Sequence, residues 1–131
     1  MNTLKLLPPV DADAVSQPFF DAAREGRLLV QRCSACQTTQ LGSEICNHCF
    51  ATQLEWVAAS GRAVIHSFVV MHMAYHPAFA PPYSAAMVEL EEGPRIPVYL
   101  VGGLAPKIGQ TAVVAFAPAE NGTSVPVARC A

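Results

Sequence analysis

The chain has few charged side chains and, over one long stretch, no basic ones. Only 14% of its 131 residues are charged, against 52% that are hydrophobic, and the formal net charge is −2. No lysine or arginine occurs from Ala63 to Pro94, and Glu89, Glu91 and Glu92 lie near the end of that stretch. Binding a nucleic acid strand needs cations along its backbone, so this stretch disfavours oligonucleotide ligands. So little charge also predicts exposed apolar surface, which usually marks a partner or a ligand.

Signals for membranes, secretion and catalysis are missing as well. No uninterrupted apolar run approaches the roughly 18 residues of a membrane span, and the first residues lack the pattern of a signal peptide. We therefore expect a cytoplasmic protein. The sequence has no nucleophile elbow, phosphate loop, dinucleotide glycine motif or catalytic carboxylate pair. His66, His72 and His76 are loosely spaced, and we expect isolated, hydrogen-bonded histidines rather than a second metal site or an acid/base centre.

The cysteines follow a spacing that is typical of metal binding. Cys33 and Cys36 form one C-x-x-C pair, Cys46 and Cys49 form another, and nine residues separate the pairs. This spacing predicts a tetrahedral four-cysteine site that holds one zinc ion, and a closed thiolate shell makes that zinc structural. So few aliphatic residues lie between the pairs that we expect this unit to be unfolded without metal. His48 is a conceivable alternative ligand that we expect to be solvated, and Cys130 is expected to be a free thiol.

The rest of the pattern predicts a mainly β protein of three parts. Residues 1–27 form an N-terminal arm and a helix over about 17–25, capped by Ser16, whose apolar face (Phe19, Phe20, Ala23) covers the ribbon or the main core. Residues 28–53 form a zinc ribbon. Residues 54–131 hold a lead-in at 54–59 and five strands at 62–73, 83–90, 95–101, 111–116 and 125–129, the first long and curved. This favours a five-stranded OB-fold barrel, although an SH3-like barrel or an open sandwich gives nearly the same pattern.

The segment 74–83 joins the first two of these strands and has an unusual composition. It contains three prolines and three aromatic residues and carries no formal charge. Prolines restrict such a loop before it binds, and aromatic side chains make good interface anchors. The alternative is that Phe79 and Tyr83 fold down and cap the barrel, and the two interpretations have similar weight.

Several short motifs in order resemble one family of small proteins. They comprise Glu25-Gly26-Arg27-Leu28, the strand that ends at Cys33, both C-x-x-C pairs, Leu54-Glu55-Trp56, Ser60-Gly61-Arg62, Pro81-Pro82-Tyr83 and Glu92-Gly93-Pro94-Arg95. Proteins of that family join an N-terminal rubredoxin-like zinc ribbon to a C-terminal OB-fold and were long described as a domain of unknown function. The family often has glycine after each C-x-x-C, which allows a positive φ, whereas this chain has Gln37 and Phe50 there. The resemblance covers about residues 18–127.

The resemblance implies an accessory role in acyl-CoA chemistry. Such proteins are typically not enzymes alone but dock on thiolase-superfamily enzymes, acyltransferases or retro-aldolases in hetero-oligomers and help hold CoA or its pantetheine arm. It implies contacts near His72 and in the loop that carries Tyr75, Phe79, Pro82 and Tyr83. Arg62, Arg95, Lys107 and Arg129 are candidates for the CoA phosphates, unless the partner supplies most of the cations. The alternatives are a single-stranded nucleic-acid-binding module and a free-standing acyl-CoA-binding protein.

Overall fold

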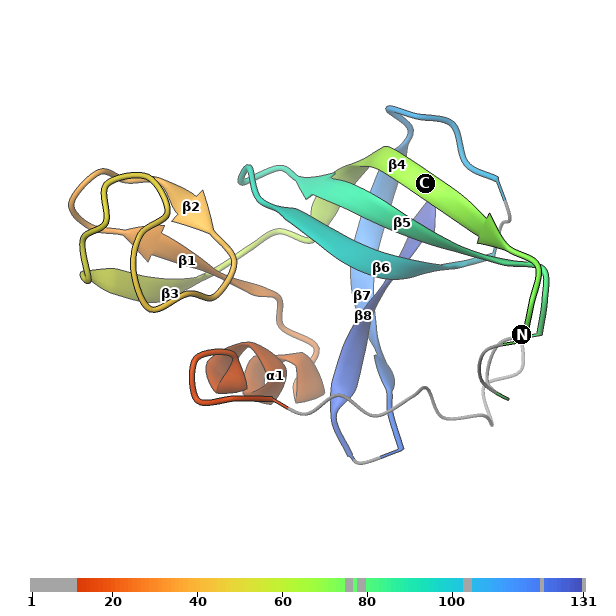
Figure 1. Cartoon of the computed structure of the whole chain (residues 1–131), viewed down its shortest axis with the longest axis horizontal. Coiled ribbons are helices and arrows are strands. Elements are labelled where there is room, and N and C mark those ends of the chain that lie inside the picture. Colours follow the sequence, from red (N-terminus) through yellow and green to blue (C-terminus); the bar gives the residue numbers. More distant parts are fainter. Residues whose placement is uncertain (1–11, 75–76, 78–79, 103–104, 121, 131) are drawn as a thin grey trace.

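A short helix, a small three-stranded sheet and a closed barrel follow one another along the chain (Figure 1). The computed structural model describes residues 12–74, 77, 80–102, 105–120 and 122–130. The small sheet lies beside one end of the barrel, and the helix lies below the junction of the two in the view of Figure 1. This confirms the predicted order of helix, ribbon and barrel.

Helix α1 spans Gln17–Arg24, and the way it starts differs from the prediction. The side chain of Ser16 makes no capping hydrogen bond to the helix. Instead Asp13 Oδ1 accepts a hydrogen bond from the Ser16 backbone N–H at 2.8 Å, and Ser16 Oγ accepts one from the Asp13 N–H at 3.1 Å. This reciprocal pair is a capping box placed one turn earlier, because the Gln17 N–H already donates to the Asp13 carbonyl. The hydrogen bond from Ser16 lowers the pKa of Asp13.

The helix ends as the glycine pattern predicts. Gly26 has a φ of 77°, and its N–H donates to the carbonyl of Ala23. A positive φ suits glycine because it has no Cβ to clash with the backbone.

Among the described residues, no helix is long and apolar enough to cross a membrane.

The ribbon sheet consists of β1 (Leu29–Cys33), β2 (Thr39–Gln40) and β3 (Leu54–Ala58), in the order β2-β1-β3. All five residues of β3 pair with β1 in antiparallel register, from Leu29 opposite Ala58 to Cys33 opposite Leu54. We expected residues 54–59 to lead into the barrel, but they complete the sheet of the ribbon first. The division into parts at residues 27/28 and 53/54 stays a prediction.

The barrel consists of β4 (Arg62–Met71), β5 (Tyr83–Leu90), β6 (Arg95–Val101), β7 (Thr111–Pro118) and β8 (Ser124–Cys130). The strand order is β4-β5-β6-β8-β7, and β7 pairs with β4 to close the barrel. β6 and β8 run parallel, and all the other neighbours are antiparallel. This is the Greek-key arrangement of an OB-fold, which confirms the prediction. The long strand β4 shifts register between Ile65 and Ser67, where an irregular pairing bends it as expected.

The core joins the barrel to the base of the ribbon. Alternate residues of the barrel strands point inward, and Leu28 and Val30 of the ribbon belong to the same cluster of buried residues. Helix α1 adds Phe19, whose ring packs edge-on against Phe116 of β7 with centroids 6.0 Å apart. Phe19 therefore packs against the main core, as predicted. The most buried large side chains of this cluster are Val30, Ile65 and Val88.

Candidate metal centre and ligand surfaces

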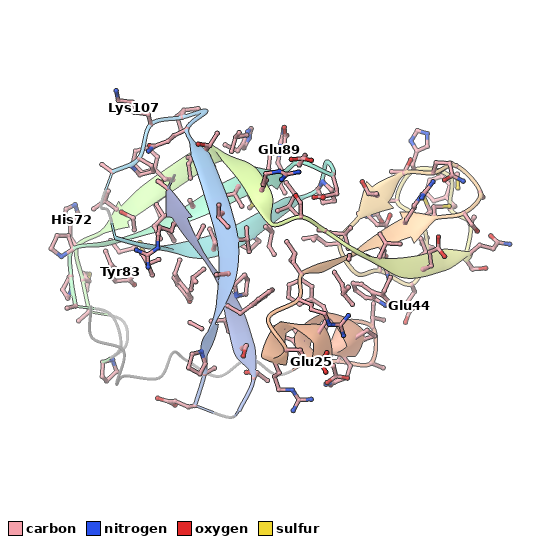
Figure 2. All side chains as sticks on the ribbon, turned by 180° about the vertical axis from the view of Figure 1, so that it is seen from behind. Glu25, Glu44, His72, Tyr83, Glu89 and Lys107 are labelled. Carbon is pink, nitrogen blue, oxygen red and sulfur yellow. The ribbon has the colours of Figure 1, made fainter. Side chains whose placement is uncertain are left out.

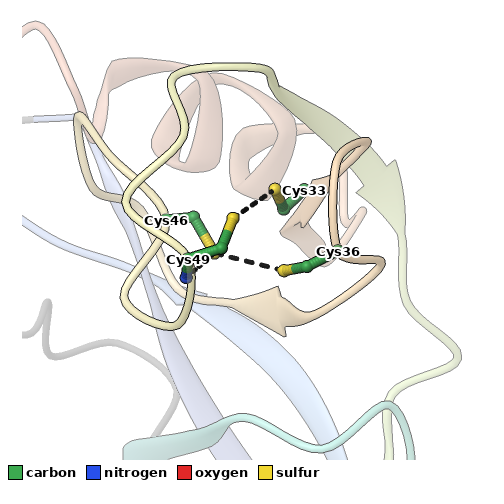
Figure 3. Close-up of side chains that lie close together, drawn as sticks. All are labelled: Cys33, Cys36, Cys46 and Cys49. Atoms are coloured by element: carbon green, nitrogen blue, oxygen red, sulfur yellow. Dashed lines mark hydrogen bonds between the residues drawn. The ribbon is translucent and has the colours of Figure 1, made fainter.

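The four cysteines of the ribbon converge on one point (Figure 3). The Sγ atoms of Cys33 and Cys49 are 3.6 Å apart, as are those of Cys36 and Cys46, and all four lie within 4.8 Å of one another. Four Zn–S bonds of about 2.3 Å in a tetrahedron put the sulfurs about 3.8 Å apart. The observed spacing therefore fits zinc, and the soft thiolate set is the one that zinc prefers in structural sites.

Each C-x-x-C pair sits on a tight turn that closes in the same way. The Gln37 N–H donates to the Cys33 carbonyl at 2.8 Å, and the Phe50 N–H donates to the Cys46 carbonyl at 3.0 Å. Both turns require a positive φ at the residue after the pair, and Gln37 and Phe50 have values of 66° and 64°. The structure thus confirms the conformation expected at these glycine-like positions, although neither residue is glycine.

Two buried glutamines take the place of a hydrophobic core in this unit. Gln31 and Gln40 lie opposite each other in β1 and β2 and are 5% and 6% exposed. Gln31 exchanges two hydrogen bonds with the backbone of Ser43, and Gln40 bonds the Ile45 carbonyl and the Asn47 N–H. A fifth bond, donated by Gln40 Nε2 to Gln31 Oε1, joins the two amides at 3.1 Å. These bonds fix the loop that delivers Cys46, so the ligand geometry depends on them.

Without a bound cation, the surroundings of these cysteines disfavour the state in which all four side chains are thiolates. Hydrogen bonding to the hydroxyl and backbone of Thr38 lowers the pKa of Cys36 to about 6. At Cys49 a backbone hydrogen bond from Ala51 favours the thiolate, but desolvation and the three neighbouring thiols outweigh it and raise its pKa to about 12. A bound dication would compensate the crowded negative charge, so metal binding and proton release are coupled here.

His48 is not part of the metal cluster. It is exposed, and its backbone N–H donates to Cys46 Sγ at 3.3 Å, which stabilises the thiolate. Cys49 adds a second such bond at 3.4 Å. Cys130 lies at the end of β8, remote in the fold from the four ligands, and is a free thiol as expected.

The residues expected to contact CoA divide between the two ends of the barrel. Arg62 is held by Glu91 through two hydrogen bonds of 2.6 and 3.1 Å, and Arg95 is held by Glu89 at 3.1 Å. These ion pairs lie at the end of the barrel near the ribbon. Both guanidinium groups remain more than half exposed.

The other predicted contacts lie far from this end. Figure 2 shows His72 and Tyr83 at the far end of the barrel, with Glu89 near the ribbon. With a rise of about 3.3 Å per residue, the length of β4 keeps Arg62 and His72 apart. Pro82 is exposed and Tyr83 half-buried, whereas Tyr75 and Phe79 lie outside the described residues. Among the described residues, the single chain thus does not bring His72 and Tyr83 together with Arg62, and the role of the whole set in CoA contact stays a prediction.

A pocket that the sequence did not predict lies where helix, ribbon and barrel meet. It has a volume of about 510 Å³, and none of the described residues that line it is charged. Its walls include the aromatic side chains of Phe19, Phe20, Trp56 and Tyr99. The one available sequence signal was proline inside the β-patterned runs, at Pro97 and Pro126, because proline in a strand often marks an interruption of pairing.

Comparisons with known proteins bear on both parts of the chain. Residues 20–55 match the rubredoxin-like zinc ribbon domain of ChsH2, and residues 56–117 match the C-terminal OB-fold domain of ChsH2. A solved structure described as an Ltp2-ChsH2(DUF35) aldolase contains a chain that is 36% identical, with a TM-score of 0.82 over 93% of this chain and 98% of that one. This chain belongs to the ChsH2 family.

Two further proteins are similar to this chain. A probable enoyl-CoA hydratase alpha subunit from Thermomonospora curvata is 39% identical over 115 residues, which are 85% of this chain but only 36% of that protein. A DUF35 protein of unknown function from Sulfolobus solfataricus is 16% identical with a TM-score of 0.67, over 92% of this chain and 87% of that one. The second likeness shows the shared fold alone. The first shows a ChsH2-like region inside a longer protein.

Proposed function

We propose that this chain is a non-catalytic accessory subunit of an enzyme complex that acts on acyl-CoA thioesters. The observation that carries the proposal is its 36% identity, over nearly the whole of both chains, to the ChsH2 component of an aldolase complex. The partner would be a thiolase-type enzyme, retro-aldolase or acyltransferase that carries the chemistry, with CoA held at a shared site.

The zinc centre fits this role as a structural element. Its four protein ligands leave no open position for a substrate, so the metal would hold the ribbon in shape and take no part in the reaction. The side chains of Arg62 and Arg95 are exposed beside their glutamates, and they remain candidates on this chain for binding the CoA phosphates.

A second candidate partner is a hydratase. The hydratase alpha subunit of Thermomonospora curvata contains a region like this chain, and this chain spans only 36% of its length. In that case a separate polypeptide would supply the hydratase activity. With either partner, the present chain would lie beside an enzyme that acts on an acyl-CoA.

The proposal is tested by co-expression of the tagged chain with the thiolase-type and hydratase-type proteins of the same genome. We expect near-stoichiometric co-purification with one of them, and no thiolysis, retro-aldol cleavage or hydration by the isolated chain. The tag alone is the control bait. Robust turnover of an acyl-CoA by the isolated chain would contradict the accessory role, as would the absence of any stable complex.

A further inference from the structure

The apolar pocket coincides with an opening in the wall of the barrel. β6 and β8 pair only at Tyr99–Val101 with Val127–Arg129. Before that point β6 pairs with β5 alone and β8 with β7 alone, so two strand edges diverge without hydrogen bonding to each other. The pocket is lined by these diverging segments, at residues 96–99 and 125–126. Helix α1 covers the same region with Phe19 and Phe20.

Proline occupies both edges of this opening. Pro97 pairs with Met87 on one side of β6, and Pro126 pairs with Phe116 on one side of β8. Strand edges without a neighbour usually present free N–H groups to water or to another chain. Proline has no N–H, so it removes the donor at these positions and blocks the addition of a further strand. The opening is therefore stable, apolar and unsuited to pairing with a peptide.

The aromatic walls are held in fixed positions. The rings of Phe19 and Phe20 pack edge-to-face with centroids 5.1 Å apart. Trp56 packs so closely over Gly42 that a Cβ at residue 42 would lie 3.1 Å from its Cη2 atom. Such a contact is tighter than proteins tolerate without adjustment, so the glycine lets Trp56 occupy its place. A preformed pocket of this kind costs little ordering when a ligand binds.

We propose that this pocket binds the uncharged, hydrophobic end of the substrate's acyl group, an inference that rests on the proposed function. Its volume of about 510 Å³ lies within the range of about 300–1,000 Å³ typical of small-molecule sites. The uncharged lining excludes the nucleotide end of CoA, whose phosphates need cations. One partner side chain would fill only part of the space. The reacting carbons stay with the partner, and this chain binds the remote part of the substrate, which contributes binding energy to the reaction.

Binding to the isolated chain tests the inference directly. Trp56 is the only tryptophan and lines the pocket, so its fluorescence reports occupancy. The probe is N-phenyl-1-naphthylamine, a neutral aromatic dye, and we expect saturable energy transfer from Trp56 to the bound dye. The variant Ala85→Phe places a ring into the pocket from β5 and should weaken binding at least tenfold. The variant Ala115→Phe adds the same ring at an exposed position of β7, outside the pocket lining, and should bind the dye as tightly as the parent does.

Competition identifies which end of a thioester the pocket takes. Octanoyl-N-acetylcysteamine, an uncharged thioester, should displace the dye, whereas free CoA should not. Displacement by CoA alone, absence of saturable binding, or equal binding by Ala85→Phe and the parent would overturn the inference. Circular dichroism verifies folding, and Ala85→Leu replaces the phenylalanine variant if that one does not fold.

The same variants separate this inference from the proposed function. We expect Ala85→Phe to lose the dye but still co-purify with the enzyme partner. If the parent binds no dye and Ala85→Phe loses the partner, the pocket is a docking surface for protein, which overturns the inference and leaves the accessory role intact. If no partner is found but the dye binds as described, the proposed function fails and the pocket remains a hydrophobic ligand site.

Discussion

Phe50 combines two unfavourable features in one residue. Its φ of 64° lies in the left-handed region, which costs a non-glycine residue roughly 1–2 kcal/mol. Its side chain is 71% exposed, so contacts within the chain offset little of that cost. An exposed aromatic residue on a rigid metal knuckle is a common form of interface anchor.

The backbone cost at this residue can be measured. We expect the zinc-loaded variant Phe50→Gly to be more stable towards urea than Phe50→Ala by about 0.5–1 kcal/mol, because the strain relieved exceeds the entropy that glycine loses on folding. Both variants lose the same aromatic ring, so the comparison isolates the backbone. Equal stability of the two variants would show that the turn stores no such strain.

At this scale the sequence predicted which four cysteines converge but not what positions them. C-x-x-C spacing identifies the four cysteines because the chelating turn is local. The hydrogen bonds of Gln31 and Gln40 depend on the register of β1 with β2 and on the path of the loop to Asn47. No periodicity reveals such bonds, so the two glutamines read as ordinary polar residues.

The ribbon is the element that depends most on its metal. Its strands are short, β2 having two residues, and its interior consists largely of thiols and amides. The variant Cys46→Ser should therefore lose the zinc equivalent and the amide-exchange protection of residues 29–58, while β4 to β8 stay protected. Metal analysis and hydrogen exchange check this, with Cys130→Ser as the matched control that keeps its zinc. Full protection of the ribbon in Cys46→Ser would contradict it.

The barrel strands were predicted closely, but their partners were not all predictable. Alternation and turn residues gave 83–90 and 95–101 for β5 and β6, as observed. Strand β3 shows the limit of this prediction, because the sequence of its five residues does not indicate which sheet they join. Only the three-dimensional structure shows that Leu54–Ala58 pairs with β1 and forms the second edge strand of the ribbon sheet.

Across the whole molecule, Glu92 joins the ribbon to the barrel. Its carbonyl accepts a hydrogen bond from the Thr39 hydroxyl, and its carboxylate accepts one from the Ser60 N–H at 2.8 Å. Ribbon and barrel should therefore tumble as one body. The variant Glu92→Ala keeps the backbone bond to Thr39 and removes only the carboxylate bond to Ser60, so we expect a loss of about 0.5–1.5 kcal/mol of stability and faster local motion around Ser60 by ¹⁵N relaxation, with ribbon and barrel still tumbling together.

Glu92→Gln provides the matched control for that experiment. Its amide oxygen still accepts the bond from Ser60, so the segment around Ser60 should relax as in the parent. Identical relaxation in Glu92→Ala and the parent would show that this bond does not hold the segment.

The apolar pocket could not be predicted from the sequence because its lining residues are far apart along the chain. Phe20, Trp56 and Pro126 line it together, yet they come from the first, middle and last parts of the chain. The predicted CoA contacts show the reverse, because Arg62 begins β4 and His72 directly follows its end. Closeness in sequence was a poor guide to closeness in space in both cases.

The packing of Phe19 against Phe116 sets an order of events on the ribosome. Helix α1 leaves the exit tunnel before β7 and β8, two of the strands that it packs against. Phe19 therefore stays without its partner ring until β7 has been synthesised. A zinc-loaded ribbon can form during that interval, so helix α1 completes its packing on the barrel only after the ribbon has folded.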